Sequence, residues 1–261
     1  MDRSFFFALL LVLPIPLSAN WLSAPVKDSP SVNQLKTSGN ACGPACLLDA
    51  FRSGSKKWRS SIARIEGTSD KDKIINIIKA HGRKASRLDA TKARWNTRQG
   101  INAPDLADMA NEMRAAMWMG TVKQELFFPG NRESSSQLLQ RTHRNLTRSL
   151  EKGLPPILSI RRMALRAPAR NSAPVWLTVK RHFVVLTGLP AQLPKNAESF
   201  QVTYHDPWGG KKLTGTVRLP KPEERKIGTL VVDFTGSNIG RNLVRRGEQT
   251  RLSLSSAIGL F

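Results

Sequence analysis

The sequence predicts an α+β domain in which an N-terminal group of helices packs on a C-terminal antiparallel sheet. Up to Gly153, apolar residues recur with the spacing of amphipathic helices. Beyond Gly153, short β-branched runs are separated by Gly, Pro and Asn. Helices that precede the strands, instead of alternating with them, favour segregated helices and an antiparallel sheet.

The first nineteen residues have the three regions of a secretory signal peptide. An apolar run from Phe5 to Leu17 follows Arg3, and small residues lead to a predicted cleavage after Ala19. The run is shorter than the roughly 20 apolar residues that span a bilayer and contains two prolines. We therefore expect a secreted or periplasmic protein with no transmembrane helix after signal removal.

The remaining chain, of ~240 residues, has a suitable length for one large globular domain. With 40% hydrophobic residues, it can form a substantial core. We expect a signal peptide over 1–19, one domain over 20–236 and a basic, partly ordered tail over 237–261. Residues 20–38 are polar and contain two prolines, which predicts an extended lead-in.

Four helices are predicted from apolar periodicity and from residues that favour helix ends. The first begins within 42–45, with Pro44 in its first turn, and ends before Gly54. The others are predicted over 71–81, 102–119 and 134–153.

Six strands are predicted in the second half of the chain, each bounded by turn-forming residues. They cover residues 156–160, 176–179, 183–187, 200–204, 213–219 and 229–234.

The chain has 41 Lys and Arg against 19 Asp and Glu, a net charge of +22. Such an excess attracts polyanions, so an anionic polymer or membrane surface is a candidate partner; a basic surface with no specific partner is the alternative. The basic residues are dispersed in short clusters, and no nucleic-acid-binding motif accompanies them. Nucleic acid is therefore disfavoured as a partner.

The only two cysteines are Cys42 and Cys46, four residues apart. A disulfide between them would close a loop too short to stabilise the fold much. Their spacing, with scattered histidines, does not match a zinc site, so neither a metal nor a cofactor is expected. We expect Cys46 to be a small buried core residue; a resolving or regulatory thiol, which could switch the protein off by bonding to Cys42, is the alternative.

Three local segments could together carry nucleophilic chemistry: 40–45 (NACGPA), 181–188 (RHFVVLTG) and 204–210 (YHDPWGG). Cys42 falls at a predicted helix N-terminus, where the helix dipole and free N–H groups favour thiolate.

A thiolate nucleophile needs a base and a group that orients the base. His182 opens one predicted strand and Asp206 ends another, so neighbouring strands would bring them together beneath Cys42. The separation of 140 residues between Cys42 and His182 agrees with the range of about 130 to 150 for papain-like enzymes. His205 alternates to the opposite strand face from Asp206, so we expect it at the surface.

With these motifs the chain resembles papain-like cysteine peptidases of the double-glycine-leader, bacteriocin-processing branch (peptidase C39-like) and its stand-alone relatives. The resemblance rests on the CGPA segment, the GLPPI segment from Gly153, the HFVVL strand and the DPWGG turn. It covers roughly residues 33–210, although 53–151 match in order of helices more than in residues. It implies a papain-like fold with Cys42 as nucleophile, His182 as base and Asp206 as orienting acid.

The sequence departs from this family at the oxyanion hole. The family's glutamine precedes the cysteine by six residues, where this chain has Lys36; the nearest glutamine, Gln34, precedes Cys42 by eight. Gln34, Asn40 or backbone N–H groups are therefore the candidate donors, and loss of one such donor costs about 10² to 10³ in rate.

Two functions follow. The first is a thiol-dependent cysteine peptidase or amidohydrolase, a hydrolase that forms an acyl-enzyme on Cys42 with a peptide or protein substrate; transfer of the acyl group to another amine would use the same residues. The second is a catalytically weak or inactive papain-like binding module whose basic surface holds an anionic envelope component.

Overall fold

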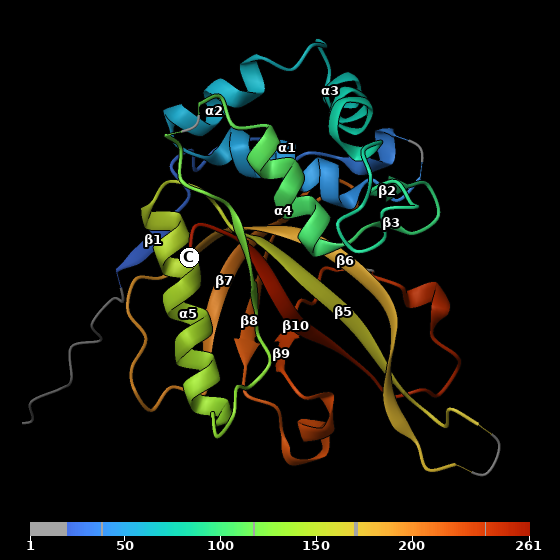
Figure 1. The fold of residues 1–261 in the computed structure, drawn as a ribbon. Helices are drawn as coiled ribbons and strands as arrows, with labels where there is room; N and C mark the ends of the chain where they lie inside the picture. Colours follow the sequence, from blue (N-terminus) through green and yellow to red (C-terminus); the bar gives the residue numbers. More distant parts are fainter. Residues whose placement is uncertain (1–19, 38, 117, 170–171, 238) are drawn as a thin grey trace, which may run out of the picture.

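The computed structural model describes residues 20–37, 39–116, 118–169, 172–237 and 239–261. The expected signal peptide, 1–19, lies outside these residues. A layer of helices covers one end of a β-barrel, and a long helix, α5 (Ser135–Glu151), runs along the side of the barrel (Figure 1). In the described part of the chain, no helix is long and apolar enough to span a membrane.

The barrel is a ring of six antiparallel strands in the order β6–β5–β10–β9–β8–β7, closed by the pairing of β7 with β6. Two further strands pair with the ring: β1 (Trp21–Ser23) with β6 and β4 (Lys123–Leu126) with β10. The ring strands are β5 (Ile157–Arg166), β6 (Val175–Pro190), β7 (Ser199–Asp206), β8 (Lys211–Arg218), β9 (Leu230–Asp233) and β10 (Thr250–Gly259).

The prediction of a papain-like α+β fold is wrong, because the sheet closes into this barrel. The physical reason lies mainly in β6, which covers two predicted strands as one continuous strand. It pairs with β5 along its length and with β7 and β1 near its end, with a register shift between Leu186 and Gly188. Bulges of this kind bend a strand and increase its twist, which favours closure.

The predicted tail over 237–261 is also wrong. Residues 250–259 form β10, which lies between β5 and β9 in the ring and also pairs with β4. Leu252 and Leu254 face the barrel core and alternate with Ser253 and Ser255, which are also buried, so this short apolar and polar alternation was the signal for a strand in the sequence. Without β10 the ring would be open, so the C-terminal segment completes the fold.

The helical layer consists of α1 (Cys42–Ser53), α2 (Lys56–Ala63), α3 (Asp70–Ile77), which continues as the π-helical turn η2 (Ile78–Gly82), and α4 (Ala103–Glu112). The sequence did not predict α2, and α4 ends before the predicted boundary at 119. Between η2 and α4 lies the short hairpin of β2 (Trp95–Asn96) and β3 (Gly100–Ile101). Three 3₁₀ turns complete the elements: η1 (Gln34–Lys36), η3 (Pro222–Ile227) and η4 (Arg241–Leu243).

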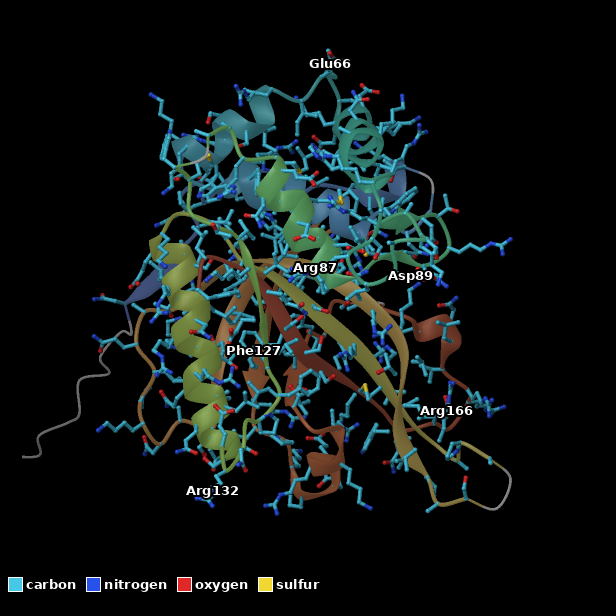
Figure 2. The ribbon with its side chains drawn as sticks, in the orientation of Figure 1. Glu66, Arg87, Asp89, Phe127, Arg132 and Arg166 are labelled. Carbon is cyan, nitrogen blue, oxygen red and sulfur yellow. The ribbon has the colours of Figure 1, made fainter. Side chains whose placement is uncertain are left out.

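Two hydrophobic cores lie on opposite sides of the barrel wall. The alternation along β6 shows the division: Phe183 and Val185 face the helical layer, whereas Val184 and Leu186 face the barrel interior. Phe127, labelled in Figure 2, is fully buried in the second core, which also includes the apolar face of α5. Ten of the twelve residues of α1 are buried, so its position relative to β6 is tightly fixed.

Candidate active site

Cys42 is the first residue of α1, the helix that packs on β6. The N-cap residue, Ala41, has no side chain that can cap this helix, so first-turn N–H groups are candidates to bind another acceptor. Close packing explains Gly43: a Cβ at this position would lie 2.4 Å from Ile101 Cγ2 and 3.2 Å from Leu106 Cδ1. The glycine therefore lets the first turn of α1 approach β3 and α4.

His182 and Asp206 form a buried pair behind Cys42. His182 Nε2 lies 2.7 Å from Asp206 Oδ1, and the two residues are 5% and 1% exposed. Asp206 also accepts hydrogen bonds from Trp208 N–H, at 2.9 Å, and from Ser237 Oγ, at 3.2 Å. The carboxylate is thus held from three directions and orients the imidazole ring.

Barrel closure brings this pair together. Val185 lies opposite His205 in the β6–β7 ladder, so Asp206 ends β7 almost opposite His182 on β6. Both side chains belong to the strand face that turns toward the barrel interior, at the end covered by α1.

The pKa values of Cys42 and His182 move in opposite directions. Burial by itself raises the pKa of the Cys42 thiol, but a hydrogen bond with His182, its charge and the N–H groups of Phe183 and Gly43 bring the pKa below its usual value. Burial lowers the pKa of His182, but hydrogen bonds to Asp206 and Cys42 outweigh this and raise the pKa to about 9. The site therefore favours a thiolate–imidazolium pair at neutral pH.

The two side-chain candidates for an oxyanion donor have different surroundings. Asn40 Nδ2 already donates to the carbonyls of Thr97 and Arg98, so it fastens the β2–β3 hairpin to the start of α1. Gln34 is buried, its backbone N–H donates to Pro207 O at 2.9 Å, and its Oε1 has no partner among the described residues. It lies beside the turn that follows Asp206.

A second buried His–Asp pair, which sequence reasoning missed, lies next to the first. His205 Nδ1 is 2.9 Å from Asp49 Oδ1, and both residues are buried. The prediction that His205 lies at the surface is wrong, because α1 covers the outer face of β7 here. The signal in the sequence was Asp49 itself, a charged residue in the most apolar helix.

Cys46 is a free, fully buried cysteine one turn after Cys42. Burial raises its pKa well above the usual value, and the neighbouring charges of Cys42, Asp49 and Asp206 add to the effect. Cys46 is therefore held as a neutral thiol, consistent with a core residue.

A cleft of about 740 Å³ opens in front of Cys42, between the helical layer and strands β5 and β6. Six basic side chains and one acidic side chain, Asp89, line it. Asp89 lies on the loop between η2 and β2 (Figure 2), where it pairs with Lys92. Arg94 pairs with Glu112. The other four basic residues have no carboxylate partner among the described residues: Arg98, Arg161, Lys180 and Arg181.

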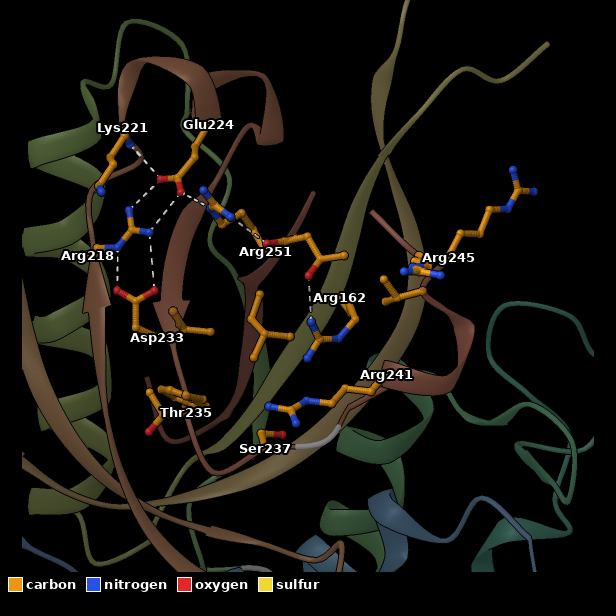
Figure 3. A pocket seen from close by; sticks show the side chains of 16 residues that line it. Arg162, Arg218, Lys221, Glu224, Asp233, Thr235, Ser237, Arg241, Arg245 and Arg251 are labelled. Carbon is orange, nitrogen blue, oxygen red and sulfur yellow. Dashed lines mark hydrogen bonds and ion pairs between the residues drawn. The ribbon is translucent and has the colours of Figure 1, made fainter. Parts of the chain in front are cut away.

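A second cavity, of about 1020 Å³, lies on the other side of β5 and is also basic. Its two carboxylates form ion pairs within the cavity: Glu224 with Arg218 and Arg251, and Asp233 with Arg218 (Figure 3). Arg162 is 8% exposed and donates to Ile239 O and Thr250 Oγ1. Burial lowers the pKa of Arg162, and the nearby charge of Arg241 lowers it further.

In comparisons with known proteins, no protein-family model matches this chain and no curated protein matches it significantly. The described residues contain no group of three His, Cys, Asp or Glu side chains placed to hold a metal ion. The functional assignment therefore depends on the geometry around Cys42.

Proposed function

We propose that the protein is a thiol-dependent hydrolase of peptides or related amides that forms an acyl-enzyme on Cys42. The observation that carries the proposal is the convergence of three side chains from α1, β6 and β7: Cys42, His182 and Asp206. The order of the three motifs resembles that of double-glycine-leader peptidases, and this resemblance supports the same roles.

The Cys42 thiolate attacks the carbonyl carbon of the amide, a C–S bond forms, and the carbonyl electrons move to the oxygen. When the tetrahedral adduct collapses, the C–N bond breaks and His182 gives its proton to the leaving amine. His182 then accepts a proton from the water that attacks the thioester, which releases the acid and restores the thiolate. Asp206 holds the ring of His182 throughout.

Oxyanion stabilisation in this mechanism comes from the N–H groups at the start of α1, with Gln34 as the side-chain candidate. Asn40 contributes by positioning, since its amide is engaged with the β2–β3 hairpin. An amine in place of water would lead to acyl transfer through the same thioester.

The pH dependence of Cys42 alkylation by iodoacetamide tests the proposal directly. We expect the alkylation rate of the wild type to rise as the Cys42 thiol ionises, with a pKa below the usual value near 8.5. A second change in rate is expected near pH 9, where His182 loses its proton. In His182→Ala the thiol pKa should rise, because the charged partner is gone. A Cys42 thiol with an ordinary pKa, or one that iodoacetamide alkylates slowly, would contradict the proposal.

The acyl-enzyme itself can be tested with p-nitrophenyl acetate. We expect a burst of nitrophenolate and an acetyl thioester on Cys42 that turns over in wild type. Cys46→Ala is the matched control, since it removes a thiol one turn away and should leave the burst intact. A burst that survives Cys42→Ala would place the acyl group elsewhere.

The cavity around Arg162 favours a second candidate function, the binding of an anionic polymer. Buried arginines are usually paired with carboxylates, and Arg162 faces Arg241 instead. An anionic group at this point would relieve the repulsion.

Retention on heparin, used as a probe, tests this second function. Arg162→Gln/Arg241→Gln should elute at clearly lower salt than Lys56→Gln/Arg59→Gln, which removes the same charge from exposed positions on α2. Equal retention of the two double variants would mean that the net charge alone is responsible.

A further inference from the structure

The register of β5 and β6 places like charges directly opposite one another. Arg161 faces Arg181, and the next pair along the ladder is Arg162 and Lys180. Like charges at directly opposed positions of an antiparallel pair destabilise the sheet. The register therefore concentrates four positive charges on two neighbouring rungs of the ladder.

Arg161 is incompletely satisfied within the protein. Its Nε is buried and has no hydrogen-bond partner among the described residues. Its guanidinium lies 5.2 Å from the centroid of the Phe128 ring, which holds the group in place without neutralising it. Burial lowers the pKa of Arg161, and the nearby Arg181 lowers it further.

Both arginines line the cleft of Cys42. They project from the face of the sheet that also presents Phe183, whose N–H group points to the Cys42 sulfur. A guanidinium with unused donors in a cleft is well suited to bind a carboxylate, which accepts two parallel hydrogen bonds.

We propose that Arg161 and Arg181 form a subsite that binds a carboxylate of the substrate, so that the hydrolase acts on acidic peptides or amides. This inference rests on the proposed function and specifies its substrate class. The carboxylate is carried on the same molecule as the scissile carbonyl, since Cys42, Arg161 and Arg181 line one cleft.

Paired alkylating reagents measure the subsite through Cys42. N-bromoacetyl-β-alanine carries a carboxylate, and its amide is the neutral match. In wild type we expect the ratio of anionic to neutral alkylation rates to exceed tenfold the ratio measured with free cysteine. In Arg161→Gln/Arg181→Gln the ratio should fall at least tenfold, with the neutral rate changed less than threefold. The glycine and γ-aminobutyrate homologues of both reagents give the distance to the subsite.

Arg98→Gln is the control for the single variants Arg161→Gln and Arg181→Gln, each of which also removes one charge, because Arg98 also lacks a carboxylate partner among the described residues but lies on the β2–β3 hairpin. If Arg98→Gln lowers the ratio as much as either single variant, the effect is diffuse charge and the subsite is overturned. The double variant should melt no lower than wild type, because like charges have been removed.

A readout without the thiol separates this inference from the proposed function. In Cys42→Ala, acetyl-Glu-Glu-amide should raise the melting temperature, whereas acetyl-Gln-Gln-amide should not, and Arg161→Gln/Arg181→Gln should abolish the shift. An unreactive Cys42 with an intact shift would overturn the hydrolase and keep the subsite. A reactive Cys42 with no shift and no rate ratio would overturn the subsite alone.

Discussion

Asp206 accepts hydrogen bonds from an imidazole, a hydroxyl and a backbone N–H, which is nearly the full capacity of a carboxylate. It is 1% exposed, so its charge would be costly without these donors. The same bonds fix the position of Asp206 against His182. The raised pKa of His182 thus comes from a carboxylate that cannot turn away.

Asp206→Asn should lower the pKa of His182 from about 9, because the amide keeps the shape but loses the charge. The upper change in the alkylation profile should move to lower pH, and turnover of acyl-enzyme should fall by about 10² to 10⁴. An unchanged upper pKa would mean that Asp206 has no electrostatic role.

The free energy of unfolding should also depend on the protonation of His182. His182 has a folded pKa of about 9 against an unfolded value near 6.5, so its charged form stabilises the fold fully below pH 6.5. This contribution, about 3 kcal/mol at ~1.4 kcal/mol per pKa unit, should be lost as the pH rises from 6.5 through 9. Urea unfolding of wild type and Asp206→Asn across this range measures it, and a difference that grows with pH would contradict the assignment.

At the scale of elements, helix α1 is joined to the rest of the site by Asp49. This carboxylate accepts from His205 on β7 at 2.9 Å, from Val32 N–H at 3.1 Å and from Ser53 Oγ at 3.1 Å. The helix that presents Cys42 is therefore bonded to the strand that presents Asp206. The segment before Gln34 is held by the same residue.

Asp49→Ala should destabilise the protein by about 3 kcal/mol, because it leaves buried donors without an acceptor. The double variant with His205→Ala should cost less than the sum of the single variants, as expected for residues in contact. Alkylation of Cys42, measured well below the melting temperature, should slow in Asp49→Ala. Ser53→Ala is the control, since it removes one bond and leaves the link to β7; a comparable slowing in this variant would contradict the tether.

At the scale of the whole molecule, the closed barrel is filled by side chains that fit one another. A Cβ at Gly215 would lie 2.4 Å from the ring of Phe234, so the glycine on β8 makes room for that ring. Phe234 stacks on Tyr204, with ring centroids 4.1 Å apart, and Tyr204 lies two residues before Asp206. Packing in the barrel thus extends to the end of β7 at the site.

Gly215→Ala should therefore lower the free energy of unfolding by about 1 to 3 kcal/mol through overpacking. Phe234→Leu in the same chain should restore part of the loss, because the smaller side chain vacates the space. Gly130→Ala, where only Glu133 Oε2 lies within 4 Å of the added Cβ, is the control and should have little effect on urea unfolding. Equal losses at both glycines would mean that the contact with Phe234 is not the cause, because the entropic effect of Gly→Ala on the unfolded chain is stabilising.

Local pattern predicted the positions of most elements. Pro44 and Gly54 bracket α1, and Asn102 caps α4 as expected, because capping and periodicity depend on neighbouring residues. The helix α2 was missed because its eight residues are mostly polar and only Trp58, Ser61 and Ile62 are buried. Local pattern did not predict that the sheet closes into a barrel, because closure depends on the bulge in β6 and on the pairing of β6 with β7.

The sequence by itself determined the chemistry available: a cysteine at a helix N-terminus, a strand histidine and a strand-end aspartate in a very basic chain. Only the tertiary structure decided that the strands close into a barrel and that residues 250–259 complete it. It also decided that His205 binds Asp49, and that Arg161 faces Arg181 in the cleft of Cys42. The physical reason is that residue type and period act over a few neighbours, whereas strand register, burial and charge proximity arise between residues far apart in the chain, 156 positions for His205 and Asp49.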